Sequence, residues 1–172
     1  MKTIKYEVIQ EWNDEGQLIR EAWWVGGKLH REDGPAVEAN DGFKQYYING
    51  IRHRENGPAI EWPDGSADYW INGKRHREDG PAVEFSNGSK EYWLNGVLHR
   101  EDGPALEYSN GYRAYYINAV LHREDGPAMV YPDGSKEWYL NGKQLTEDEF
   151  NASSCHGKIV TIDGKQYRLE PV

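Results

Sequence analysis

His76-Arg77-Glu78-Asp79-Gly80-Pro81-Ala82 is the stretch that decides the fold, because this heptapeptide occurs five times along the chain. The copies begin at His30, His53, His76, His99 and His122, always 23 residues apart, and Asn56 is the one departure from the pattern. A period in the low twenties is typical of stacked supersecondary units, each of which buries its apolar face against its neighbour. The sequence therefore predicts a repeat protein.

Two short strands follow each heptapeptide. In the repeat 81–103 they cover residues 82–85 and 90–94, and the second strand ends at Asn95-Gly96. Asn-Gly favours the positive φ angles of a type I′ two-residue hairpin. The same slot holds Gly26-Gly27, Asn49-Gly50, Asn72-Gly73, Asn95-Gly96, Asn118-Ala119 and Asn141-Gly142. Ala119 breaks the pattern, and a Cβ in the left-handed region costs about 1 kcal/mol.

Counting outward from a two-residue turn predicts the register of this hairpin. Ile71 should face Lys74 and Trp70 should face Arg75, so that Tyr69 faces His76. Equivalent pairs are Trp23/His30, Tyr46/His53, Tyr92/His99 and Tyr115/His122, and Trp138/Leu145 at the end of the array. We expect each His to stack on its aromatic partner or to bond a hydroxyl group there.

The remaining constant positions also favour structural roles. A Gly at 42, 65, 88, 111 and 134 follows Asp or Asn, which is typical of a turn capped by an Asx side chain. Glu-Asp-Gly-Pro should form a bulge or tight corner, because Pro has no N–H to donate to a strand ladder. For the charged residues of the heptapeptide we expect Arg–carboxylate contacts between neighbouring repeats.

The array is expected to end in two caps. Residues 1–24 predict an N-terminal capping hairpin around Asn13-Asp14-Glu15-Gly16, residues 25–143 hold the five repeats, and residues 144–172 form a C-terminal cap. Thr146 and Glu149 form a capping box, and Leu145 with Phe150 forms a hydrophobic staple, which predicts a helix of about two turns. A hairpin over 158–170 should follow, with Val160, Ile162, Tyr167 and Leu169 on one face.

Asn-Gly-Lys followed by His, then a strand, Asp-Gly-Ser-Lys and an aromatic pair, resembles the MORN repeat. The chain looks most like the divergent MORN-like repeats of bacterial and bacteriophage proteins, including the YwqK antitoxin-like group, over residues 20–143. The departure is Arg-Glu-Asp-Gly-Pro-Ala, which stands where MORN repeats continue with Gly-x-Gly after the His. The resemblance implies an all-β fold, an elongated antiparallel β-meander or solenoid of hairpin repeats that serves as an interaction surface. Lipid binding has been proposed for some MORN proteins.

Composition limits the partners. The net charge of −9 disfavours nucleic acid and anionic membranes and favours a protein partner with a basic surface. Seven Trp and twelve Tyr against three Phe predict a thin, aromatic core. Cys155 is the one cysteine, and residues 1–7 begin no apolar run of signal or membrane length, so we expect a cytoplasmic protein of a bacterium or phage-infected cell, without integral membrane contact.

The repeated His-Arg-Glu-Asp invites an enzymatic interpretation. Neighbouring residues of a strand point to opposite faces, however, and five equal copies mark no reactive one, so we predict no catalytic residue. Histidines one repeat apart would lie about 10 Å from one another, too far to share an ion. His156 beside Cys155 is more typical of a loop than of a metal site. We therefore expect no metal and no cofactor.

Binding is expected where the repeats vary. The positions flanking the Asx-Gly turn change from repeat to repeat, and the candidate binding residues among them are Trp62, Phe85, Tyr108, Tyr112 and Tyr131. Aromatic side chains dominate interface energetics when exposed, although the same rings could pack on adjacent repeats. The prediction is a non-catalytic protein-interaction module, such as a bacterial or bacteriophage inhibitor, which could also pair with a second copy.

An alternative class uses the constant cations. A binder or enzyme for an anionic small molecule such as a nucleotide would present a ladder of imidazole and guanidinium groups, since Arg forks suit phosphate and carboxylate. That ladder would consist of His30, Arg31, His53, Arg54, His76, Arg77, His99, Arg100, His122 and Arg123.

Overall fold

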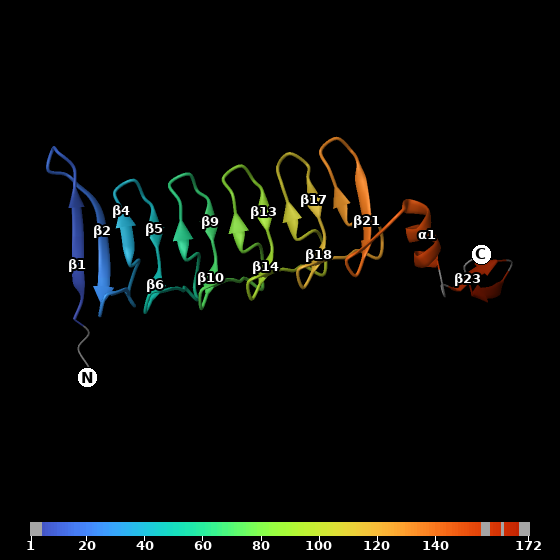
Figure 1. Ribbon diagram of the computed structural model, residues 1–172, viewed down its shortest axis with the longest axis horizontal. Coiled ribbons are helices and arrows are strands. Elements are labelled where there is room, and N and C mark those ends of the chain that lie inside the picture. The colour runs from blue at the N-terminus through green and yellow to red at the C-terminus, as the bar shows by residue number, and fades with distance from the viewer. Residues whose placement is uncertain (1–4, 156–158, 163, 169–172) are drawn as a thin grey trace. The chain divides into compact units, whose positions relative to one another are not determined.

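The computed structural model describes residues 5–155, 159–162 and 164–168, and nearly all of their regular structure is β-strand (Figure 1). The chain forms two compact units, Met1–Val97 and Leu98–Val172. In both units the strands are antiparallel and follow one another in meander order, and the second unit ends in a short helix and a hairpin. The predicted all-β class of hairpin repeats is confirmed.

The first unit contains a sheet with the order β1-β2-β4-β5-β8-β9-β12-β13. Short hairpins leave this sheet at the ends of β5 and β9. The strands are β1 (Glu7–Trp12), β2 (Leu18–Val25), β3 (Lys28–Leu29), β4 (Val37–Ala39), β5 (Lys44–Gln45), β6 (Tyr47–Ile48), β7 (Ile51–Arg52), β8 (Ile60–Glu61), β9 (Ala67–Asp68), β10 (Trp70–Ile71), β11 (Lys74–Arg75), β12 (Val83–Glu84), β13 (Lys90–Glu91) and β14 (Trp93–Leu94). The division between the units falls within β15 (Val97–Leu98).

The second unit repeats the pattern with the order β16-β17-β20-β21-β22 and a separate β18-β19 hairpin. Its elements are β16 (Leu106–Glu107), β17 (Arg113–Ala114), β18 (Tyr116–Ile117), β19 (Val120–Leu121), β20 (Met129–Val130), β21 (Lys136–Leu140), β22 (Lys143–Leu145), α1 (Glu147–Cys155), β23 (Ile159–Ile162) and β24 (Lys165–Arg168). In both units the Asx-Gly turns lie at one end of the strands and the short hairpins at the other (Figure 1).

The short hairpins have the predicted turn and register. Asn72 and Gly73 take φ angles of 50° and 76°, and Trp70 pairs with Arg75 as counting from the turn requires. His76 donates its N–H to the carbonyl oxygen of Tyr69 at 3.1 Å, which continues the same register by one residue. The Asx-Gly turns are confirmed too, since the N–H group two residues after each Asx donates to its Oδ1 atom at 2.8–2.9 Å.

The heptapeptide forms a corner between a short hairpin and the next sheet strand. Residues 78–80 are a bend between β11 and β12, and Ala82 behind them has no exposed surface. A Cβ on Gly80 would lie 3.1 Å from Cζ of Arg77, so the Gly leaves room for the guanidinium group that folds back over it. The corner needs Gly because the backbone and that side chain approach closely.

Small aliphatic residues fill the centre of the fold. Buried positions include the alanines that close the heptapeptide, Ala36, Ala59, Ala82, Ala105 and Ala128, together with Val37, Ile60, Val83 and Ala114. Among the described residues Phe150 is the one buried aromatic, while the Trp and Tyr rings of the repeats are half-buried or exposed. The expectation of an aromatic core is therefore wrong. Strands this close leave room inside only for short side chains, and the large rings lie along the margins.

Both ends follow the predicted patterns. β1 pairs with β2, and Asn13 caps the connecting turn by accepting the N–H of Gln17 at 2.8 Å. At the other end Thr146 and Glu149 form the capping box, with backbone N–H contacts of 2.8 and 3.2 Å, and α1 extends slightly beyond the two turns expected. β23 pairs with β24 as predicted. Leu169, expected on one face of that hairpin, lies outside the described residues.

Candidate functional site

The repeated histidines join successive hairpins. Nδ1 of His30 accepts the backbone N–H of Asn49, the first residue of the next hairpin turn, at 3.0 Å. The same bond recurs at 3.0–3.1 Å for His53–Asn72, His76–Asn95, His99–Asn118 and His122–Asn141. The expected partnership of His with the aromatic ring opposite is wrong, although the backbone register behind it is right. An accepting Nδ1 places the proton of a neutral imidazole on Nε2.

In four repeats the aromatic ring opposite the His instead lies beneath the neighbouring Arg. The Cζ atom of Arg77 is 4.0 Å from the ring centroid of Tyr69. Equivalent distances are 4.1 Å for Arg31 over Trp23, 3.8 Å for Arg54 over Tyr46 and 4.0 Å for Arg123 over Tyr115. Contacts this close are cation–π interactions.

The Arg guanidinium groups of the heptapeptides are also hydrogen-bonded, and Arg100 is an example. Arg100 donates Nε to Asp102 at 2.9 Å and Nη1 to Glu107 at 2.8 Å, and reaches the carbonyl oxygen of Pro104 at 3.3 Å. The bond from Arg100 lowers the pKa of Asp102. Glu107 belongs to the following repeat, which confirms the Arg–carboxylate contacts expected between repeats, while Asp102 is a partner within the heptapeptide.

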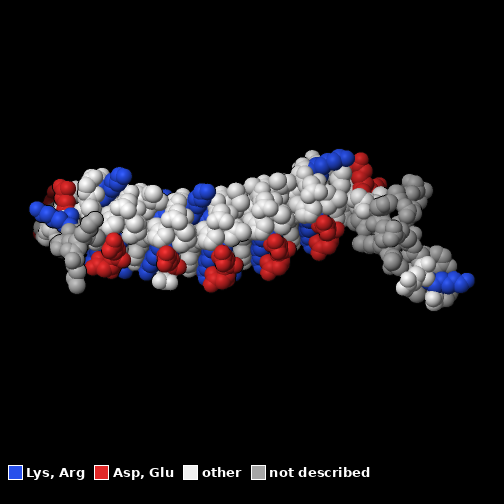
Figure 2. Space-filling model, turned by 90° about the horizontal axis from the view of Figure 1, so that it is seen from below, with Lys and Arg blue, Asp and Glu red and all other residues white. Residues whose placement is uncertain are grey.

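The glutamate side chains of the heptapeptide point into solvent. Glu101 and Glu124 have side chains that are 84% exposed, and each faces a His Nε2 atom, at 3.8 and 3.6 Å. Among the described residues of their unit neither is paired with Lys or Arg. Figure 2 shows Asp and Glu side chains gathered in groups beside Lys and Arg. In the first unit Glu32, Glu55 and Glu78 are likewise exposed, and each faces the Nε2 atom of a His.

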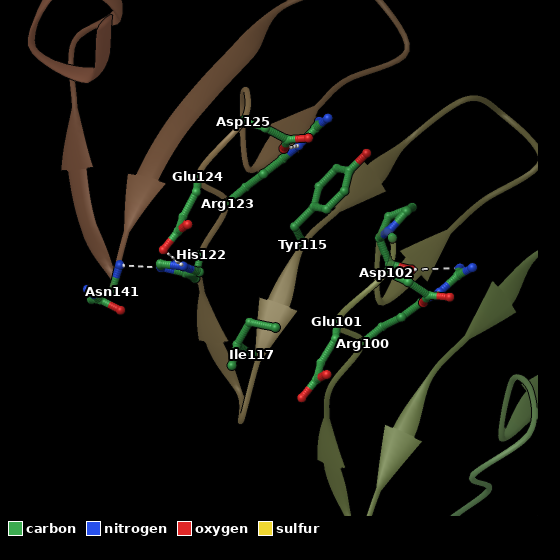
Figure 3. A pocket seen from close by; sticks show the side chains of 12 residues that line it. Arg100, Glu101, Asp102, Tyr115, Ile117, His122, Arg123, Glu124, Asp125 and Asn141 are labelled. Atoms are coloured by element: carbon green, nitrogen blue, oxygen red, sulfur yellow. Dashed lines mark hydrogen bonds and ion pairs between the residues drawn. The ribbon is translucent and has the colours of Figure 1, made fainter. Parts of the chain in front are cut away.

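A groove lies between consecutive heptapeptides. In the second unit it has a volume of about 770 Å³, with Glu101 on one wall and Glu124 on the other. Tyr115 and Ile117 lie between the two walls and form the floor (Figure 3). In the first unit an equivalent groove of about 430 Å³ has Glu32, Glu55, Tyr46 and Ile48 in the matching positions. Sequence reasoning missed this site, although an aliphatic residue recurs in the floor position every 23 residues.

The predicted aromatic binding residues lie beside the Asx-Gly turns. In the first unit Trp62 and Phe85 are 42% and 39% exposed, and Trp62 packs against Phe43 with a centroid distance of 5.0 Å. Trp12, beside the turn of the N-terminal hairpin, is 55% exposed and was not among the predicted residues. This end of the first unit presents apolar rings to solvent.

In the second unit the same positions form a tyrosine cluster. Tyr112 lies between Tyr108 and Tyr131, with centroid distances of 5.7 and 5.6 Å. Tyr131 donates to Oε1 of Glu137 at 2.9 Å, and this bond raises the Tyr131 pKa to about 12. The three rings are half-buried against one another, so the expectation that such rings pack on adjacent repeats describes this unit better than the first.

Two buried acids in the first unit also escaped the sequence reasoning. Asp68 and Glu91 are 6% and 8% exposed, and Arg75 lies within 3.1 and 3.5 Å of their carboxylates. Trp93 donates its indole N–H to Glu91 at 2.9 Å. A charge is retained in a protein interior when it is paired and hydrogen-bonded, so this cluster is part of the packing.

Metal-ligating clusters and membrane-spanning helices are the remaining features to compare with the described residues. Among these, no three His, Cys, Asp or Glu residues come close enough to hold a metal ion. The described residues include no helix with the length and apolar character needed to cross a membrane. His156 lies outside the described residues. No family model matches the chain, and no curated protein matches it either, so the MORN-like resemblance stays a prediction from the repeat residues.

Proposed function

We propose that this chain is a non-catalytic protein-interaction module that binds a partner with a basic surface. The observation that carries the proposal is that the positive charge of the heptapeptide is paired whereas one of its negative charges is exposed. Arg123 is stacked on a ring and hydrogen-bonded to carboxylate and carbonyl oxygens, whereas Glu124 projects into solvent and has no Lys or Arg partner among the described residues of its unit. Repetition of this arrangement gives each unit a negative surface that would attract a basic partner at long range.

The alternative of an anionic small molecule has less support. Phosphate bound by the ladder would meet Arg100 and Arg123 with their charge already paired to an Asp, at 2.9 and 2.7 Å. It would also lie close to the exposed Glu101 and Glu124. An inhibitor of a basic protein, of bacterial or bacteriophage origin, agrees better with this charge distribution.

Affinity capture with matched charge variants tests the proposal. One variant replaces Glu32, Glu55, Glu78, Glu101 and Glu124 by Gln, and the control replaces five exposed acids outside the heptapeptides, Glu7, Asp14, Glu15, Glu147 and Asp148, by their amides. We expect the wild type and the control to retain a basic protein that moderate salt releases, and the heptapeptide variant to lose it. Equal retention by all three chains would refute the proposal, as would an acidic partner.

A further inference from the structure

We infer that the grooves between consecutive heptapeptides receive the Lys or Arg side chains of an extended basic segment, at one side chain per repeat. This inference rests on the proposed function, and it names the conformation and spacing that a partner segment would need.

The lining of the groove suits a basic side chain. Ile117 provides an apolar floor beside Tyr115, whose ring already lies beneath Arg123, and Glu101 and Glu124 stand on opposite walls (Figure 3). A Lys or Arg side chain combines an aliphatic stem with a charged end. Its stem would cover the floor while its charged end reaches the carboxylate on one wall. Arg100 and Arg123 also line the groove, but their guanidinium groups are already paired with Asp102 and Asp125.

The spacing of the grooves follows from the sheet. Each repeat contributes two strands to the sheet of its unit, as β8 and β9 do in the first unit. Neighbouring strands lie about 4.8 Å apart, so equivalent points of adjacent repeats are about 9.6 Å apart. The first unit has heptapeptides at His30, His53 and His76, and the 23-residue period places Ile71 between Glu55 and Glu78 as Ile48 lies between Glu32 and Glu55. We therefore expect a second groove next to the first in this unit.

Few peptide conformations match that spacing on one face. A polyproline II helix has three residues per turn and a rise of 3.1 Å, so every third side chain recurs on the same face after about 9.3 Å. A β-strand advances about 9.9 Å in three residues, but its i and i+3 side chains point to opposite faces. An α-helix needs seven residues and about 10.5 Å. The polyproline II segment fits best, with a basic residue at every third position.

Calorimetric titration of the full chain with synthetic peptides tests this inference. The first peptide repeats Arg-Pro-Pro four times, and the second has the same composition with its four arginines in one block. A third is an Ala-based helix with Arg at every seventh position. We expect the periodic peptide to bind at least tenfold more tightly than the other two. Tighter binding of the helix, or of the block, would overturn the inference.

Charge variants locate the binding and separate the two proposals. Replacement of Glu32, Glu55 and Glu78 by Gln should weaken binding of the periodic peptide about tenfold, whereas replacement of Glu7, Glu15 and Glu147 by Gln, an equal change in charge, should alter it less than twofold. Equal affinity for all three peptides, still reduced by the first variant, would overturn the spacing and leave the proposed function standing. Absence of binding by every peptide would overturn the inference, whereas the proposed function would still be tested separately by the capture experiment.

Discussion

Substitution at the second residue of the hairpin turns tests how the repeats are built. Ala119 has a φ angle of 65°, in a position where the neighbouring repeats have Gly with φ between 76° and 87°. The left-handed region costs a residue with a Cβ about 1 kcal/mol or slightly more. Ala119→Gly should therefore raise the free energy of unfolding, while the greater freedom of Gly in the unfolded chain offsets about 0.4–1 kcal/mol of that gain.

The reverse change separates two contributions to this free energy. Gly16 has a φ angle of +75°, and a Cβ added there would have no atom within 4 Å, so Gly16→Ala tests the backbone conformation alone. Gly73 has a similar φ angle of +76°, but a Cβ added there would lie 3.1 Å from Cγ2 of Ile51 in the preceding hairpin. Gly73→Ala should therefore destabilise the protein more than Gly16→Ala, because crowding between stacked hairpins adds to the strain.

Urea denaturation of the four chains measures these differences in the free energy of unfolding. In a thermal melt, a difference of 1 kcal/mol would shift the midpoint by about 2–4 °C for a chain of this size. We expect stability to fall in the order Ala119→Gly, wild type, Gly16→Ala, Gly73→Ala. An Ala119→Gly chain less stable than wild type would refute the left-handed turn, and equal effects at Gly16 and Gly73 would refute close stacking of the hairpins.

Three further predictions concern the polar contacts. His122→Ala should reduce the free energy of unfolding by about 1 kcal/mol, because the hydrogen bond from the Asn141 N–H is lost. His122→Asn keeps an acceptor at the δ position and should recover part of that loss. Indistinguishable urea midpoints would show that the His122–Asn141 bond does not hold successive hairpins together. The pKa of Tyr131 is raised from 10.0 to about 12 by its bond to Glu137, so this contribution to stability is complete below pH 10 and is lost as pH rises toward 12. In Glu137→Gln, NMR titration of labelled tyrosine should show Tyr131 returning toward 10, and an unchanged value would exclude the carboxylate as the cause. Thr146→Ala should destabilise α1 by about 1 kcal/mol, measured as loss of helical circular dichroism on heating, and no loss would contradict the capping box.

Local rules predicted the hairpins well because their turns are short. Asn72-Gly73 leaves no freedom in the number of loop residues, so the pairing of Trp70 with Arg75 follows by counting. The capping box of Thr146 and Glu149 is likewise a contact between residues three apart. In both cases the partners are close in sequence, and chain geometry alone decides what they can reach.

Counting residues from the turn gave the right partner for the His76 backbone but not for Arg77, the residue after it. His76 continues the hairpin register through its backbone, but Arg77 donates its N–H to Trp93 of the next hairpin at 3.2 Å. At this point the chain leaves one ladder for another, and alternation of faces no longer holds. Sequence reasoning could therefore not tell which of the two side chains would cover the ring of Tyr69.

The groove was hidden for a related reason. Its floor residue Ile117 and its wall residues Glu101 and Glu124 come from different repeats, and the distance between them depends on how the repeats stack. Comparison of equivalent positions gives a partial signal, because Ile48, Ile71 and Ile117 are aliphatic although their strands are only half-buried. That signal marks a constant side chain without showing that two carboxylates stand beside it.

Nuclear Overhauser contacts between the full chain and the periodic arginine peptide test the central claim most directly. With methyl-labelled isoleucine, we predict contacts from the Ile48, Ile71 and Ile117 methyl groups to the side-chain methylene protons of arginine. Contacts confined to the exposed rings of Trp62 and Phe85, with none to these methyl groups, would contradict the claim and place binding beside the Asx-Gly turns instead.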